Sequence, residues 1–221
     1  MSINIEVYHT LKEKTAAANA TLVAVSKLKP VSDIQTLYEL GHRDFGENYV
    51  QELMDKAAQL PEDIRWHFIG HLQSNKVKYI ASFVHLIHGI DSEKLLAEVN
   101  KQAAKHNKNI SCLLQVHIAQ EETKFGFDGA ELKAVAEKIK GNTYPNVSVE
   151  GLMGMASFSD DVEKVAGEFD YLKQLFDEVQ ASSANPSFKT LSMGMSGDYE
   201  MAIHKRSNMI RVGSLLFGRR G

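Results

Sequence analysis

Lys27 is the residue of this sequence best placed to act as a nucleophile. It ends the apolar run Thr21–Lys27, in which Val23, Val25 and Lys27 share one face if the run is a strand with its period of two. A lysine in phase with apolar residues loses part of its preference for the charged form, and its neutral amine attacks carbonyl groups. The alternative, which the pattern by itself favours, is a lysine that reaches solvent at a strand end. We expect the nearby Lys29 to be solvated.

Two segments rich in glycine and serine near the C-terminus could bind an anion. Ser196–Asp198 precedes an expected helix over 199–205, and Gly213 and Ser214 follow the last apolar run. Backbone N–H groups at such positions point at anions, and the loops after the seventh and eighth strands of an α/β barrel are the usual phosphate position. Asp198 would either oppose an anion there or support the first turn of the helix. Each segment by itself is also an ordinary glycine turn.

Arg211 is a charged residue inside an apolar run, two residues before Gly213. A buried charge requires a partner or a ligand. One interpretation is therefore a site residue, and the other is a salt bridge to a barrel-lining carboxylate such as Glu47 or Glu150.

The other reactive side chains give weaker indications. His67 and His71 lie four residues apart but run from a strand into a loop, and His85 and His88 would face opposite sides of a strand. Neither pair has the geometry of shared metal ligation, so we expect no structural metal. Cys112 lies in the middle of an apolar run, where an inert core thiol is expected.

The elements that would position these residues are eight short apolar runs, each suited to a buried strand. Helical periodicity fills the segments between them, which favours a parallel sheet. Eight strands predict an α/β fold: a closed (β/α)8 TIM barrel, rather than an open sheet, with an extra helix before Thr21. The runs are Thr21–Lys27, Arg43–Gly46, Arg65–Gly70, Phe83–Gly89, Ile110–Ile118, Val149–Met153, Phe188–Met193 and Met209–Val212.

Three helices have recognisable ends or faces. Ser32 and Gln35 form a possible capping box, and the helix that they open would end at Gly41. The segments Ser92–His106 and Asp160–Ser182 each carry apolar residues on one face.

The bulk composition suits one cytoplasmic domain over residues 1–221. The formal net charge of the 221 residues is −3, without the basic excess of proteins that bind nucleic acid or membrane surfaces. The N-terminal segment lacks the pattern of a signal peptide, and no apolar stretch approaches the ~18 residues of a membrane span. A single cysteine excludes an internal disulfide.

The sequence resembles the pyridoxal phosphate homeostasis proteins, also called proline synthetase co-transcribed homologues, over nearly its whole length. Six motifs carry the resemblance in order, and the third is the most specific to that family. They are Val23–Lys27 (VAVSK), Phe45–Glu52 (FGENYVQE), Trp66–Lys76 (WHFIGHLQSNK), Glu150–Met153 (EGLM), Leu191–Ser196 (LSMGMS) and Arg211–Arg219 (RVGSLLFGR).

The resemblance implies a barrel like the N-terminal domain of alanine racemase and pyridoxal 5′-phosphate (PLP) as the cofactor. It implies that Lys27 forms a Schiff base with the cofactor and that Arg211 lies near its pyridine nitrogen. It also implies that Asn48 approaches the ring. The phosphate would lie among Ser196, Gly213 and Ser214, where Ser214 replaces the threonine of many relatives and keeps the hydroxyl.

We therefore expect a non-enzymatic PLP carrier in vitamin B6 homeostasis, acting as a monomer and handing the cofactor to apo-enzymes. An arginine beside the ring nitrogen disfavours ring protonation, which weakens the ring as an electron sink. Two-sided proton transfer needs a second base, which racemases take from a further domain that we expect to be absent after Gly221. Two alternatives remain: a minimal PLP-dependent amino-acid racemase, and a sugar-phosphate barrel enzyme in which Lys27 is incidental.

Overall fold

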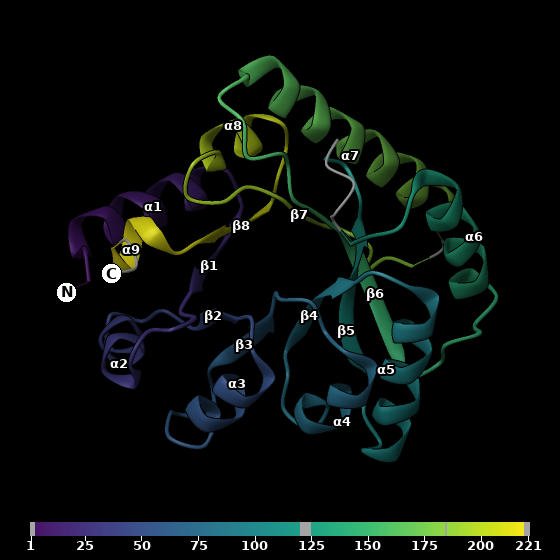
Figure 1. The fold of residues 1–221 in the computed structure, drawn as a ribbon, viewed down its shortest axis with the longest axis horizontal. Helices are drawn as coiled ribbons and strands as arrows, with labels where there is room; N and C mark the ends of the chain where they lie inside the picture. The colour runs from purple at the N-terminus through teal and green to yellow at the C-terminus, as the bar shows by residue number, and fades with distance from the viewer. Residues whose placement is uncertain (1–2, 120–124, 184, 219–221) are drawn as a thin grey trace.

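Eight parallel strands close into a barrel in chain order, with the last strand pairing with the first (Figure 1). The computed structural model describes residues 3–119, 125–183 and 185–218, so Arg219 of the sixth motif lies outside the described residues. The architecture confirms the predicted (β/α)8 TIM barrel. The strands are β1 (Thr21–Val25), β2 (Asp44–Glu47), β3 (Arg65–Phe68), β4 (Leu86–Ile90), β5 (Ile110–Val116), β6 (Val147–Gly154), β7 (Thr190–Ser192) and β8 (Met209–Val212).

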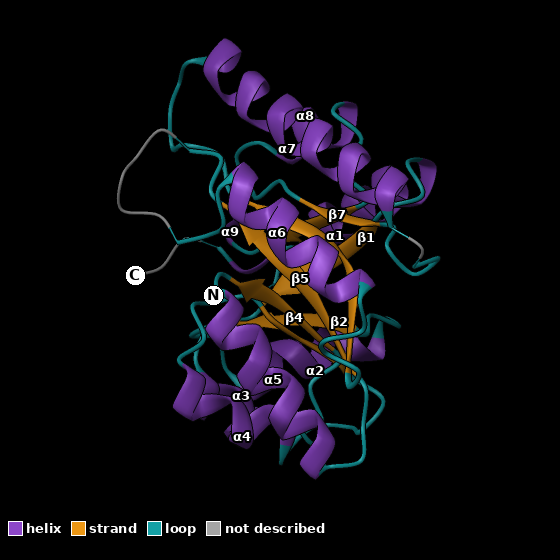
Figure 2. Cartoon of the chain, turned by 90° about the vertical axis from the view of Figure 1, so that its right-hand side faces the viewer, coloured by secondary structure: helices purple, strands orange, loops and turns teal. Residues whose placement is uncertain are grey.

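Helices surround the barrel and lie outside its strands in both views (Figures 1 and 2). The extra N-terminal helix is confirmed as α1, and none of the helices in the described residues is long and apolar enough to cross a membrane. The helices are α1 (Ile5–Ala17), α2 (Val31–Glu39), α3 (Val50–Ala57), η1 (Ser74–Lys76), α4 (Val77–Ile80), α5 (Glu93–Lys105), α6 (Gly129–Lys140), α7 (Val162–Ser182), α8 (Tyr199–His204) and α9 (Ser214–Phe217).

All eight predicted strands occur, but several end earlier or start later than their apolar runs. The correction that matters for the site is β1, which ends at Val25, so Lys27 lies in the following turn and not in the strand. An apolar pattern marks burial, whereas a strand ends where its ladder hydrogen bonds end.

Two of the helix ends show how local sequence signals act, and one predicted signal fails. Ser92 caps α5 through its side chain, and Gly41 takes the left-handed conformation (φ 86°) expected after α2. The predicted capping box at Ser32 is wrong, because α2 already begins at Val31 with Pro30 as its N-cap. Proline fixes φ near its helix-start value, so the helix begins two residues earlier than the serine suggested.

The strands separate two packed regions. A large apolar cluster fills the space between the strands and the helices, and a smaller one inside the barrel contains Val23, Leu86, Leu113, Met153 and Met209. The interior cluster is small because polar side chains from several strands share that space, and these form the networks described below.

Candidate functional site

A cleft of about 1030 Å³ opens at the C-terminal mouth of the barrel, where the loops after the strands meet. All six residues that the sequence proposed for cofactor binding line this cleft: Lys27, Asn48, Ser196, Arg211, Gly213 and Ser214. They follow or belong to β1, β2, β7 and β8, so residues far apart in the chain converge at one place. Their roles toward a cofactor stay predictions.

The turn that carries Lys27 is anchored on both sides by helix α3. Lys56 Nζ donates to the carbonyl oxygen of Ser26 at 2.7 Å, and the N–H of Leu28 donates to Glu52 Oε1 at 2.6 Å. Leu28 has a left-handed backbone (φ 60°), a conformation that costs a leucine on the order of 1 kcal/mol. The two contacts hold this strained turn and thereby fix where the Lys27 side chain enters the cleft.

A buried ion cluster lies behind these contacts. Lys56 Nζ is 2.7 Å from both Glu47 Oε1 and Glu52 Oε1, and the Lys56 and Glu47 side chains are 6% and 0% exposed. Burial raises the pKa of Glu47, while the charge of Lys56 lowers it. This cluster was not predicted from the sequence, although Glu52 and Lys56 show the four-residue spacing of a helical ion pair.

Lys29 does not behave as predicted. Its Nζ donates to the carbonyl oxygen of Phe217 at 2.8 Å, and it too lines the cleft. This contact connects the turn after β1 to helix α9, so the prediction that Lys29 is solvated is wrong.

The anion-binding segments after β7 and β8 are joined directly. The N–H of Gly213 donates to Ser196 Oγ at 3.2 Å, and Gly213 is the N-cap of α9, which has no side-chain cap. A Cβ on Gly213 would lie 3.2 Å from both the Cβ and the carbonyl oxygen of Val25, so β1 packs closely against this backbone. The serine hydroxyls and backbone of the two loops thus lie at one place, and anion binding there stays a prediction.

Asp198 supports the loop and does not cap helix α8. Its Oδ1 accepts from the N–H of Met195 at 2.5 Å, and it makes no side-chain cap to the helix. Gly194 sets the preceding bend, because its φ is 98° and a Cβ there would approach Ala202 Cβ to 2.5 Å. The carboxylate of Asp198 is thus held by the turn that presents Ser196.

Arg211 is buried in β8 and is held by neutral oxygens. Its Nη1 donates to Ser192 Oγ at 2.6 Å and its Nη2 to the carbonyl oxygen of Gly154 at 3.1 Å. Burial lowers the pKa of Arg211 to about 10, while the charge of Asp198 acts to raise it. The alternative of a salt bridge is wrong, because Glu47 binds Lys56 and Glu150 accepts from Ser111.

Asn48 supplies an unsatisfied acceptor at the same mouth. Its Oδ1 is buried and has no hydrogen-bond partner among the described residues. A buried unsatisfied acceptor costs about 1–3 kcal/mol, which a ligand donor would recover. Gly70, within the third motif, makes this position possible, because a Cβ there would lie 2.3 Å from the Asn48 carbonyl oxygen.

The polar groups that line the cleft fit a phosphorylated aromatic aldehyde. They combine a lysine amine, serine hydroxyls with backbone N–H groups, an amide oxygen and a guanidinium. Cys112 does not belong to them: the thiol is buried in β5, and burial raises its pKa, as expected of an inert core residue.

Comparisons with known sequences agree with this chemistry. The model of the alanine racemase N-terminal domain matches residues 6–221. A pyridoxal phosphate homeostasis protein of Aquifex aeolicus is 41% identical over 202 residues, covering 91% of this chain and 87% of the relative. One of Pasteurella multocida is 35% identical over 222 residues, covering 99% and 94%.

Solved structures show the same fold. PipY of Synechococcus elongatus, solved with PLP bound, is 33% identical with a TM-score of 0.83, covering 90% of this chain and 93% of PipY. The alanine racemase of Bartonella henselae has a TM-score of 0.74 at 18% identity, covering 99% of this chain and 60% of the racemase. At that identity the similarity to the racemase shows the barrel fold alone.

Proposed function

The chain belongs to the family of the pyridoxal phosphate homeostasis proteins, and from this premise we propose that it binds PLP at the C-terminal mouth of its barrel and keeps the cofactor available inside the cytoplasm. The observation that carries the proposal is the convergence of the six predicted residues on one cleft. PipY, a relative with PLP bound, supports the same ligand.

Each residue of the cleft has a role that its chemistry suits. PLP supplies an aldehyde that forms a Schiff base with a primary amine, and Lys27 is the amine whose turn is held in place by α3. Ser196, Gly213 and Ser214 would hold the phosphate, with hydroxyls and backbone N–H groups as donors. Arg211 would face the ring nitrogen, and the unsatisfied oxygen of Asn48 would accept from the ligand.

We propose a carrier and not an enzyme. Racemisation needs a second acid or base opposite the lysine. Among the described residues that line the cleft, the one tyrosine is Tyr199, and its hydroxyl is engaged with Lys14 Nζ at 3.3 Å and Glu200 Oε1 at 3.1 Å. A cationic Arg211 also disfavours protonation of the ring nitrogen, which weakens the ring as an electron sink. The carrier would act as a monomer and release PLP to apo-enzymes.

A comparison of two neighbouring lysines tests the proposal. Purified protein is titrated with PLP, and the visible spectrum is recorded for the wild type, Lys27→Ala and Lys29→Ala. We expect a long-wavelength band in the wild type and in Lys29→Ala, made permanent by borohydride, with the added mass on the peptide that contains Lys27. Lys27→Ala should lack the band. If Lys27→Ala keeps it, or if the wild type lacks it, the assignment is wrong.

A further inference from the structure

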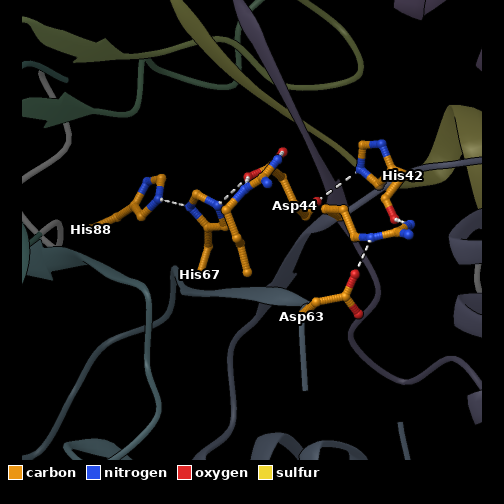
Figure 3. Close-up of polar contacts among 7 residues, drawn as sticks. His42, Asp44, Asp63, His67 and His88 are labelled. Carbon is orange, nitrogen blue, oxygen red and sulfur yellow. Dashed lines mark hydrogen bonds and ion pairs between the residues drawn. The ribbon is translucent and has the colours of Figure 1, made fainter. Parts of the chain in front are cut away.

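A continuous chain of hydrogen-bonded side chains crosses the interior of the barrel. Arg211 Nη1 donates to Ser192 Oγ (2.6 Å), which lies 3.1 Å from His88 Nδ1. His88 Nε2 is 2.9 Å from His67 Nδ1, and His67 Nε2 is 3.1 Å from Asp44 Oδ1. Figure 3 shows the end of this chain from His88 through His67 to Asp44.

The chain connects the two mouths of the barrel. Its members come from β8, β7, β4, β3 and β2 in turn, and each is at most 9% exposed. Asp44 is the first residue of β2, at the N-terminal mouth, where Arg65 binds it with two hydrogen bonds of 2.7 and 2.5 Å. Arg211, at the other end, lines the cleft.

The groups at the two ends limit the direction of the protons between them. Arg211 can only donate. Asp44 can only accept, because the hydrogen bonds from His67 and Arg65 outweigh its burial and hold its pKa below the usual value. With both rings neutral, the Ser192 hydroxyl donates to His88 Nδ1, His88 Nε2–H donates to His67 Nδ1, and His67 Nε2–H donates to Asp44.

The surroundings of His88 favour a neutral ring. Burial, the largest effect, lowers the pKa of His88 well below its usual value. Burial also lowers the pKa of His85, whose ring packs against His67, and of His42, which contacts the Asp44 carbonyl oxygen at 2.9 Å. Of the charges among the described residues, Arg65 acts on the Asp44 end of the chain and Asp198 on Arg211.

We propose that Asp44, His67, His88 and Ser192 are positioning residues for Arg211. By fixing the direction of the protons, they present the Ser192 oxygen as an acceptor to Arg211 and hold the guanidinium as an oriented cation at the cleft. A substitution of Asp44 at the N-terminal mouth should therefore change the orientation of Arg211 at the opposite mouth. The consequence for PLP affinity rests on the proposed function, whereas the proton arrangement does not.

The first test needs no ligand. Nitrogen NMR of the imidazoles in the ligand-free protein, with signals assigned by their loss in His67→Gln and His88→Gln, should show both rings neutral with the proton on Nε2. A proton on Nδ1 of His88, or a charged His67 or His88 at neutral pH, overturns the proposal.

The second test compares two aspartates at the same mouth. Asp44→Asn removes the acceptor of the chain, and Asp63→Asn removes a carboxylate that binds Arg43 at 2.7 Å outside the chain (Figure 3). Asp44→Asn should change the ring signals of His88, which does not contact it, while Asp63→Asn should leave them unchanged. Unchanged His88 signals in folded Asp44→Asn protein overturn the coupling. If Asp44→Asn does not fold, Ser192→Ala takes its place, and the Arg211 guanidinium signal should change.

The third measurement is the affinity for PLP. Asp44→Asn and Ser192→Ala should each bind roughly 2- to 30-fold more weakly than the wild type, and Asp63→Asn should match it. Equal affinities in all four proteins overturn the role toward the cofactor. A wild type that shows the expected tautomers but binds no PLP instead overturns the proposed function and leaves the proton arrangement standing.

Discussion

The N–H of Gly213 donates to Ser196 Oγ across 3.2 Å and so joins the loops after β8 and β7 at the mouth of the barrel. A side chain at Gly213 would disturb this junction, because its Cβ would lie 3.2 Å from two atoms of Val25. We expect Gly213→Ala to lower the free energy of unfolding by about 1–3 kcal/mol and to weaken PLP binding.

Gly197 provides the matched control for this prediction. It lies in the same mouth, but a Cβ there would meet nothing within 4 Å. Gly197→Ala should therefore change the unfolding free energy, measured in urea, by less than about 0.5 kcal/mol. Equal effects of the two substitutions would show that the close approach to Val25 does not cause the loss of unfolding free energy.

Lys56 should be among the most sensitive positions of the protein. Lys56→Met leaves the fully buried Glu47 without its counter-charge, which we expect to lower the unfolding free energy by about 3–5 kcal/mol at neutral pH. Lys133→Met, which removes an exposed pair with Glu178, should cost less than about 1 kcal/mol.

The effect of Lys56→Met should depend on pH. Burial raises the pKa of Glu47 in the folded protein, so a protonated Glu47 favours the folded state at acid pH and this contribution is lost as the pH rises through the folded pKa. Losing Lys56 raises this pKa further. The difference from the wild type, measured by urea unfolding, should shrink as the pH falls toward 4.5, the ordinary pKa of a glutamate. A constant difference would contradict the assignment.

The strands and the site residues could be predicted from the sequence, whereas the networks behind them could not. Lys27 and Gly213 stand at the ends of apolar runs and Arg211 near the end of one, and periodicity together with the barrel rule is enough to bring strand ends to one mouth. His88 and Ser192 are 104 residues apart, and their contact depends on the barrel's closure and size. Periodicity assigns a face to each residue but no partner across the interior.

His42 should make the protein sensitive to acid. Burial lowers its pKa from 6.5 to about 4, so between these values the unfolded chain takes up a proton that the folded protein does not. The stability that the neutral ring contributes is therefore present above pH 6.5 and is lost as the pH falls toward 4, at about 1.4 kcal/mol per pH unit. His88, also held neutral by burial, adds to this loss.

Substitution of His42 separates its contribution to the acid sensitivity from that of His88. Urea unfolding near pH 7 and near pH 4.5 should show that His42→Gln loses roughly 2–3 kcal/mol less on acidification than the wild type. His9→Gln, at an exposed position of α1, should behave as the wild type does. If all three proteins lose the same unfolding free energy on acidification, His42 does not cause the acid sensitivity.

The distinction between carrier and racemase rests on proton transfer at the α-carbon of an amino acid. PLP-loaded protein incubated with L-alanine in deuterated water should form deuterated D-alanine no faster than PLP with Lys27→Ala, because the Tyr199 hydroxyl is engaged by Lys14 and Glu200 and Arg211 opposes ring protonation. Exchange that requires Lys27 and falls in Tyr199→Phe would instead identify a minimal racemase with Tyr199 as the second base. Exchange that requires Lys27 but not Tyr199 would leave a one-base activity, in which the retained configuration of alanine distinguishes exchange from racemisation.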